Sequence, residues 1–410
     1  MNIKSVLFAI HTITSAAATT LYASHYDGHI FTLSLSASQN GSTSLTLAST
    51  LQACGEMPSW LMLDAAEHVL YCVDESGTKS YGNGSLSSFA ISSNGSLAES
   101  SSSSSKVTTM PGGVASVIYQ AGDNNNNNKK KKKFLAIAHY AGAALSTFQL
   151  PLTPDSQPNQ VFTFTLTEPV ADPSRQDTSH PHEVFLDPTG KYILSPDLGA
   201  DLIRVFTIAS DGILQECDPF KVTAGNGPRH GAFYPASVSN DHNTTTLYIV
   251  NELSNTLSTY AVEYTDDDSC LSLSTLNETT PYPTTPLPSN AYVSEIRIPD
   301  NDIYISIRSD QGFAPNDSLA TLELVDGTGP LAAFKNLSSS YGTVPRTFAL
   351  SPDGSMVAIG NQASSNVAVV ARDVETGQLG ELLGSVQVGS EGQPGQSNGL
   401  SSVIWGNDHD

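Results

Sequence analysis

The sequence predicts an all-β protein, a seven-bladed β-propeller, on three observations. First, the 410-residue chain has almost no helical periodicity and consists of short β-rich runs that Gly, Pro, Asn and Asp interrupt. Second, a hairpin pattern recurs seven times along the chain. Third, the first repeat lacks its leading strand, and an unpaired strand remains at the C-terminus. Four short antiparallel strands at this spacing are typical of propeller blades, which bury both faces against their neighbours.

Each repeat contains an apolar run, a turn, and a second apolar run that stops at polar residues. The clearest copies are HEVFLDPTGKYILSPD from His182, RTFALSPDGSMVAIGNQ from Arg346, and RHGAFYP with TLYIVNE from Arg229, and weaker copies begin at Trp60 and Ser294. The intervals between the ends of successive second runs are 49, 65, 57, 55, 56 and 54 residues, for ends at Tyr26, Glu75, Tyr140, Asp197, Glu252, Arg308 and Gln362. A third run, such as LIRVFTI from Leu202, usually follows.

Residues 19–410 are predicted to form this single domain. TTLYASHY from Thr19 corresponds to a second strand, so LSSVIW from Leu400 can complete the N-terminal blade and remove two exposed sheet edges. Two low-complexity stretches, 100–105 and 124–133, are expected to be solvated insertions. The oligo-Lys of the second stretch could be read as a nucleic-acid patch. It lies, however, in the turn between the first two strands of the third blade of an acidic protein.

The first eighteen residues have the layout of a secretory signal peptide, with one Lys, a short apolar stretch and an Ala-rich end. The alternative is that residues 6–13 form an outer strand. Seven Asn-x-Ser/Thr sequons fit a glycosylated protein that is secreted or at the cell surface. A cytoplasmic location is the alternative. The sequons begin at Asn40, Asn83, Asn94, Asn243, Asn277, Asn316 and Asn336. No run of 18 apolar residues exists, so no membrane span is expected.

The four cysteines show no CxxC pattern for a metal or a redox centre. In an oxidising compartment one or two disulfides are expected, and Cys54 with Cys72 is the first choice because these two lie closest in sequence. Buried free thiols are an equal alternative, also for Cys217 and Cys270. The sequence leaves the oligomeric state open.

The charge balance limits the kinds of partner that the protein is expected to bind. With 18 Lys and Arg against 40 Asp and Glu, the formal net charge is -22, which disfavours nucleic acid and anionic membrane surfaces. An anionic ligand therefore needs a local cluster of Arg and His.

The hairpin pattern itself predicts such a cluster. In an antiparallel hairpin the start of the first strand lies beside the end of the second strand, so the residues at these positions in every repeat share one end of the propeller. They include both signs of charge: His182, Arg229, Glu295 and Arg346 open first strands, and Glu75, Asp197, Glu252, Arg308 and Gln362 close second strands. The alternative for Asp197 and Gln362 is that they only cap loops.

Chemically, three of these residues are permanent cations that hold carboxylates or phosphates by paired hydrogen bonds: Arg229, Arg308 and Arg346. His182 and Glu252 can transfer protons. No Gly-rich phosphate loop occurs. A metal set from His180, His182 and Glu183 is disfavoured because a strand places His182 and Glu183 on opposite faces. We therefore expect no metal site from this set.

Four segments resemble the seven-bladed propeller lactonase family, which contains bacterial-type 6-phosphogluconolactonase and fungal carboxy-cis,cis-muconate cyclase. They are HPHEVFLDPTGKYILSPDLGADLIRVF, GPRHGAFYP, LYIVNELSNTLSTY and VPRTFALSPDGSMVAIGNQ. The resemblance implies a catalytic set of one His, two Arg and one Glu, which in this chain are His182, Arg229, Arg308 and Glu252. The substrate-binding set is expected to include Arg346, Glu295 and His230. Because successive residues of a strand point to opposite faces, the side chain of His230 is expected to point away from the neighbours of Arg229.

The resemblance implies an enzyme that opens or forms the lactone ring of a small anionic substrate without a metal or an organic cofactor. Hydrolysis and cyclisation stay open, because both need anion binding and proton transfer. Both named activities concern intracellular metabolites, whereas this chain has the features of an exported protein, so its substrate can differ from theirs. The alternative function is that of a secreted glycoprotein which uses the propeller as a ligand-binding or adhesion surface.

Overall fold

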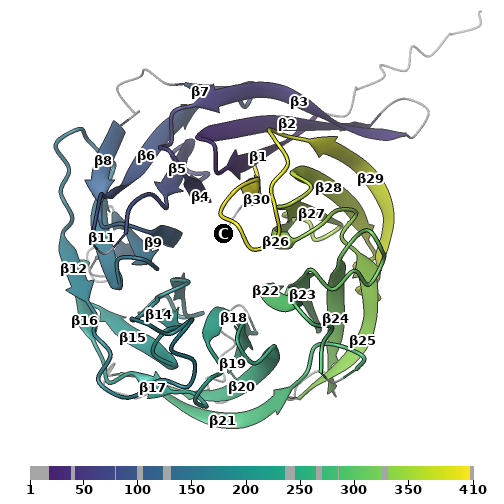
Figure 1. Cartoon of the computed structure of the whole chain (residues 1–410). Coiled ribbons are helices and arrows are strands. Elements are labelled where there is room, and N and C mark those ends of the chain that lie inside the picture. Colours follow the sequence, from purple (N-terminus) through teal and green to yellow (C-terminus); the bar gives the residue numbers. More distant parts are fainter. Residues whose placement is uncertain are drawn as a thin grey trace, which may run out of the picture.

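The strands of the chain form seven antiparallel sheets around a common centre (Figure 1). This computed structural model describes residues 18–37, 42–78, 80–98, 105–122, 131–235, 245–264, 270–284, 286–325 and 331–406. Each sheet is one blade, and its innermost strand is given first below. The predicted seven-bladed propeller is confirmed.

The first four blades follow the chain from the N-terminus. Blade 1 contains β30 (Leu400–Trp405), β1 (Thr19–His25), β2 (His29–Ala37) and β3 (Thr43–Gln52). Blade 2 contains β4 (Pro58–Asp64), β5 (Val69–Asp74), β6 (Gly84–Ile91), β7 (Leu97–Ala98) and β8 (Ser105–Thr109). Blade 3 contains β9 (Gly113–Ala121), β10 (Lys132–His139), β11 (Ala144–Leu150) and β12 (Gln160–Thr163). Blade 4 contains β13 (Phe185–Leu186), β14 (Tyr192–Asp197), β15 (Leu202–Ile208), β16 (Leu214–Glu216) and β17 (Phe220–Lys221).

The last three blades have four strands each. Blade 5 contains β18 (Pro228–Tyr234), β19 (Thr246–Asn251), β20 (Thr256–Glu263) and β21 (Ser272–Thr279). Blade 6 contains β22 (Tyr292–Arg297), β23 (Asp302–Arg308), β24 (Ser318–Leu324) and β25 (Ala332–Ser339). Blade 7 contains β26 (Pro345–Leu350), β27 (Met356–Asn361), β28 (Asn366–Arg372) and β29 (Leu379–Gln387).

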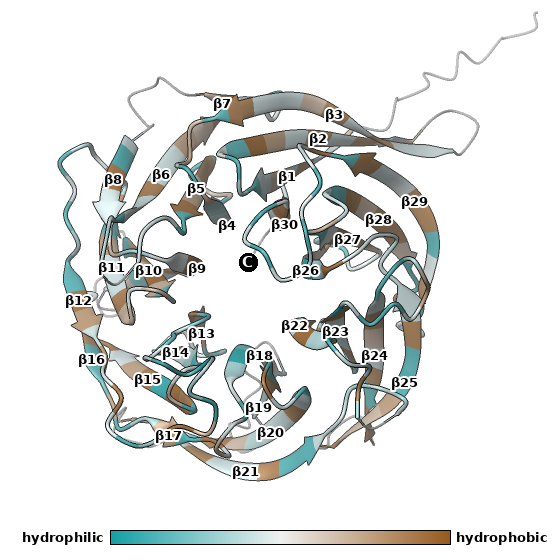
Figure 2. Ribbon diagram, viewed as in Figure 1, coloured by the Kyte–Doolittle hydropathy of each residue, from teal (hydrophilic) through white to brown (hydrophobic). Residues whose placement is uncertain are grey.

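The core is divided among the seven junctions between adjacent blades. Leu194 of blade 4 packs with Leu247 and Ile249 of blade 5, and each other pair of neighbours shares a similar cluster. Second strands such as β14 and β19 are buried along their whole length because blades cover both of their faces. The outer strands β21 and β25 are more exposed, and both carry hydrophilic as well as hydrophobic residues (Figure 2).

The two ends of the described chain meet in blade 1. β30 pairs with β1 in antiparallel register, from Leu21 opposite Trp405 to His25 opposite Leu400. Trp405 is fully buried, and its indole N–H donates to the carbonyl of Ala349 in blade 7. The predicted closure by the C-terminal strand is therefore confirmed.

Several sequence predictions fall outside the described residues. These are residues 1–17 of the expected signal peptide, the sequons at Asn40 and Asn243, and most of both insertions. The second insertion is nevertheless shorter than predicted, because Lys132 and Lys133 belong to β10. Lys133 Nζ lies 2.7 Å from both carboxylate oxygens of Asp64 in blade 2, so it joins two blades. No helix among the described residues is long and apolar enough to cross a membrane.

Both cysteine pairs form disulfides, so the free-thiol alternative is wrong. Cys54, in the connection before β4, bonds Cys72 of β5, as the sequence suggested. Cys217, which follows β16, bonds Cys270, which precedes β21, and this bond ties the outer edges of blades 4 and 5. The structure thus resolves a pairing that the sequence left open.

The two disulfides are expected to contribute unequally to stability because they close loops of different length. The separations are 53 residues for Cys217–Cys270 and 18 residues for Cys54–Cys72. The loop-entropy relation gives stabilisation of about 4 kcal/mol for the longer loop and about 3 kcal/mol for the shorter one. Urea unfolding of the two double Cys→Ala variants measures both losses. Equal losses, or a larger loss for the Cys54–Cys72 pair, would contradict this origin of the stabilisation.

Candidate active site

One end of the propeller carries a pocket of about 1100 Å³ that is lined by polar residues from several blades. Its walls include six residues named from the sequence: Glu75, His182, Glu252, Arg308, Arg346 and Gln362. They sit where first strands begin and second strands end, as the hairpin argument requires. Asp197 does not line the pocket. Its carboxylate instead accepts hydrogen bonds from the backbone N–H of His180 and from Arg204, so it caps a loop, which was its alternative role.

Glu252 is the ionic centre of the site. Its Oε2 accepts hydrogen bonds from Arg229 Nε at 2.8 Å and from Arg308 Nη2 at 2.7 Å, and its Oε1 accepts from Arg175 Nη2 at 2.5 Å. Burial alone would raise the pKa of this carboxyl, but Arg308 and the other cations hold the pKa well below its usual range. Glu252 is therefore a carboxylate at neutral pH, and its oxygens fix the positions of three guanidinium groups.

Arg229 lies behind Glu252 and is almost completely buried, at 1% exposure. Besides its bond to Glu252, its Nη1 donates to the carbonyl oxygen of Ser294 in blade 6 at 2.8 Å. The pocket lining does not include Arg229. Arg229 thus acts on the pocket through Glu252, while Arg308, which does line the pocket, presents its charge directly.

His182 lines the pocket as a neutral imidazole. Burial and then the nearby charge of Arg229 hold its pKa well below the usual value. Its ring packs edge-on against Tyr140 and His230, with centroid distances of 5.5 and 5.2 Å. Within the described residues its Nδ1 is buried and has no hydrogen-bond partner. A buried neutral imidazole with an unused nitrogen is suited to accept a proton from a bound reactant.

Arg346 is a third cation in the pocket lining, beside Arg308 and Arg175. Among the described residues its guanidinium makes no ion pair with a carboxylate, and it lies over the ring of Tyr26, 5.7 Å from the centroid. Tyr26 donates its hydroxyl hydrogen to Glu75 at 2.7 Å, and burial raises the pKa of the Glu75 carboxyl. This environment leaves the Arg346 charge available to an anionic ligand.

Arg175 is a pocket residue that sequence reasoning missed. It comes from the long connection between β12 and β13, which has no strand pattern and so gave no signal. It contacts Glu252 and also hydrogen-bonds the side chain of Tyr140, another pocket residue. The only hint in the sequence was its position in the same connection as the HPHE segment.

His230 and Glu295 were predicted to bind substrate, but the structure places both outside the pocket lining, with exposures of 2% and 0%. A bulge in β18 between Pro228 and His230 makes two residues oppose one on β19. The strand alternation restarts at this bulge. The expectation that His230 points away from the neighbours of Arg229 is therefore wrong, because both side chains reach residues of blade 6.

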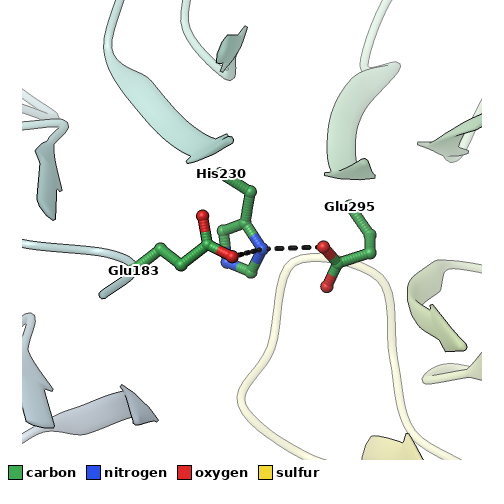
Figure 3. A group of neighbouring side chains, drawn as sticks. All are labelled: Glu183, His230 and Glu295. Atoms are coloured by element: carbon green, nitrogen blue, oxygen red, sulfur yellow. Dashed lines mark hydrogen bonds and ion pairs between the residues drawn. The ribbon is translucent and has the colours of Figure 1, made fainter. Parts of the chain in front are cut away.

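The side chains of His180, His182 and Glu183 in the HPHE segment do not converge on one point. The ring of His180 is hydrogen-bonded to the Tyr140 carbonyl and to Asp177, and it stacks on the Tyr140 ring at 4.1 Å. Glu183 instead faces His230 (Figure 3). Burial and the neighbouring Glu295 raise the pKa of Glu183 to about 8. Glu295 is held ionised by Arg297 despite its burial, and burial lowers the pKa of His230 to about 4.

Comparison with known proteins places this arrangement in context. A family model described as "Lactonase, 7-bladed beta-propeller" matches residues 18–393. A protein of Arthroderma benhamiae named "Probable 6-phosphogluconolactonase" is 34% identical over 209 residues, which is 50% of this chain and 50% of that protein. A "6-phosphogluconolactonase" of Formosa agariphila is 31% identical over 259 residues, which is 61% of this chain and 66% of that protein. The chain thus spans about half to two thirds of the length of the curated relatives it matches.

Among solved structures, the periplasmic gluconolactonase of Pseudomonas aeruginosa has a similar fold, with a TM-score of 0.70 and 23% identity. The alignment covers 95% of this chain and 99% of that chain. At this identity the similarity concerns the arrangement of the blades.

Proposed function

The chain belongs to the seven-bladed β-propeller lactonase family, and we therefore propose that it hydrolyses the lactone ring of a small anionic sugar acid in this pocket. The observation that carries the proposal is one pocket that holds an unpaired guanidinium, Arg346, and a neutral imidazole with an unused nitrogen, His182. The first can hold a phosphate or carboxylate, and the second can activate water. The names of the two curated relatives also support lactone hydrolysis.

The proposed reaction uses the side chains as follows. Arg346 holds the anionic group of the substrate, and water attacks the ring carbonyl carbon while His182 accepts a proton from that water. Negative charge develops on the carbonyl oxygen, where Arg308 stabilises it. When the tetrahedral intermediate collapses, the bond to the ring oxygen breaks and this oxygen takes the proton from His182. The product is the open hydroxy acid.

Glu252 has a different role from the proton exchange that the family resemblance implied. Its two oxygens already accept hydrogen bonds from three arginines, so neither is left to take a proton from the substrate. In the proposed mechanism Glu252 keeps Arg308 and Arg175 oriented toward the substrate and balances part of their charge. The proton transfers then belong to His182.

An extracellular location is also part of the proposal. Two disulfides support an oxidising compartment, and the sequons at Asn83 and Asn94 are exposed. In that compartment both phosphorylated and unphosphorylated sugar lactones are candidates. No observation favours the alternative of a purely adhesive glycoprotein.

The test is an activity panel on the purified full chain. Opening a lactone at neutral pH releases a proton, so a pH indicator follows hydrolysis above the spontaneous rate. The substrates are 6-phosphogluconolactone, unphosphorylated gluconolactone and galactonolactone, and carboxy-cis,cis-muconate for the cyclisation alternative. The proposal expects lactone hydrolysis that an Arg346→Met variant loses through a raised KM. Turnover of the muconate alone, or of no substrate, would contradict it.

A further inference from the structure

A second group of titratable side chains lies outside the pocket lining. Glu183 precedes β13 of blade 4, His230 lies in β18 of blade 5, and Glu295 lies in β22 of blade 6, and their side chains converge (Figure 3). His230 Nδ1 is 3.0 Å from Glu295 Oε1 and 3.5 Å from Glu183 Oε1. One nitrogen and two carboxylates from three consecutive blades therefore face a common point.

These separations agree with those of metal ligands. For metal bonds of about 2.0–2.2 Å, donor atoms around one ion lie roughly 3.0–3.5 Å apart, depending on whether the geometry is octahedral or tetrahedral. One potential ligand atom from each residue lies within 4.8 Å of the other two. A slight shortening of the third distance, between the ligand oxygens of Glu183 and Glu295, would let all three residues bind one ion.

A buried acceptor without a partner points to a missing ligand. Among the described residues, Glu295 Oε2 is buried and accepts no hydrogen bond, although the Glu295 side chain is 0% exposed. An unsatisfied carboxylate oxygen in the interior is costly, and such an atom calls for a donor, a water or an ion. A cation bound by the cluster would supply such a partner.

The surroundings already orient the donor atoms. The backbone N–H of Gly231 donates to Glu183 Oε2 at 2.6 Å, and Arg297 Nη1 donates to Glu295 Oε1 at 2.5 Å. Hydrogen bonds of this kind fix ligating carboxylates in metalloproteins. Glu183 Oε1 and Glu295 Oε2 accept none of these bonds, and both carboxylates thus retain an oxygen for an ion.

We propose that Glu183, His230 and Glu295 bind one divalent transition-metal ion, with Zn²⁺ as the first ion to test. Imidazole nitrogen favours Zn²⁺ over Mg²⁺ or Ca²⁺, while two carboxylates suit Zn²⁺ and Mn²⁺. The ion would join blades 4, 5 and 6, and none of its ligands lines the pocket. Its ligand His230 contacts the ring of His182 in the pocket wall, at a centroid distance of 5.2 Å, but metal binding does not require the proposed lactone hydrolysis.

The test uses the full chain after dialysis against EDTA. The protein is reloaded with Zn²⁺, Mn²⁺, Mg²⁺ or Ca²⁺, and the bound metal per chain and the melting temperature are measured. We expect one bound Zn²⁺ and a melting temperature raised by on the order of a few °C, with weaker effects of Mg²⁺ and Ca²⁺. Glu295→Gln and His230→Gln are expected to weaken Zn²⁺ binding by at least about 100-fold, because each removes a direct ligand.

Two matched controls separate this site from adventitious binding to an acidic protein. Glu75→Gln removes a partly buried carboxylate, and His180→Gln removes another buried imidazole, yet neither belongs to the cluster. Both variants are expected to keep the Zn²⁺ effect. Absence of bound metal in the wild type, or equal binding in Glu295→Gln and His230→Gln, would overturn the proposal and leave a shared proton between the two carboxylates.

A spectroscopic measurement on the wild type decides the question if the variants do not fold. Pulsed EPR of the Mn²⁺-loaded chain reports whether a nitrogen is bonded to the ion. We expect coupling to one imidazole nitrogen. A signal from oxygen ligands alone would contradict the site.

Discussion

Replacing Glu252 by Gln is expected to lower kcat/KM for the lactone substrate by about 10²–10⁴-fold, the range typical of groups that organise proton transfer and charge in a transition state. The amide keeps the size of the carboxylate but loses the charge that Arg229, Arg308 and Arg175 share. The three guanidinium groups then repel one another without a counter-ion. Arg308 leaves the position in which it stabilises the developing oxyanion, so kcat falls more than KM rises.

Glu278→Gln is the matched control for this change. Glu278 lies on β21 of the same blade, where it accepts hydrogen bonds from Asn226 and Ser258. It is absent from the pocket lining, so its variant is expected to keep kcat/KM within about threefold of the wild type. Glu252→Gln with a kcat/KM equal to that of Glu278→Gln would remove Glu252 from the mechanism.

The same substitution has a distinct signature in the pH dependence of folding stability. The pKa of Glu252 is lower in the folded chain than in the unfolded chain. Such a group contributes stability above its unfolded pKa of about 4.5, and this stability is lost as the pH falls through the lower folded value. The difference in melting temperature between wild type and Glu252→Gln should thus be largest near neutral pH and shrink below about pH 4.5. A constant difference across this range would show that the loss is not due to the carboxylate charge.

Much of the site followed from the periodicity of the sequence alone. In an antiparallel hairpin the end of the second strand lies beside the start of the first strand. Glu75, Glu252 and Arg308 close second strands, so they had to lie at the same end as the first-strand residues His182 and Arg346. The structure places all five around one pocket. Register and topology determine which strand ends are neighbours, whatever side chains these ends carry. The same reasoning placed the C-terminal strand beside β1.

The parts that periodicity could not predict depend on irregular backbone. Arg175 lies in a connection without repeating pattern, so no rule of strand geometry could place it beside Glu252. The bulge before His230 breaks the alternation on which its predicted direction rested. This one-residue shift places the side chain of His230 next to Glu295. His230, which was predicted to contact substrate, therefore belongs to a buried cluster outside the pocket lining.

The second large effect is expected for His182→Gln, which should lower kcat by about 10²–10⁴-fold and leave KM within a few-fold of the wild type. The substitution removes the proton acceptor, while Arg346 and Arg308 continue to hold the anionic substrate. His180→Gln is the control, since His180 lies two residues away, is buried and does not line the pocket. Steady-state kinetics of both variants separate the two contributions. A raised KM at unchanged kcat in His182→Gln would make His182 a binding residue, because a group that acts only by proton transfer changes the rate of the bound complex and not its formation.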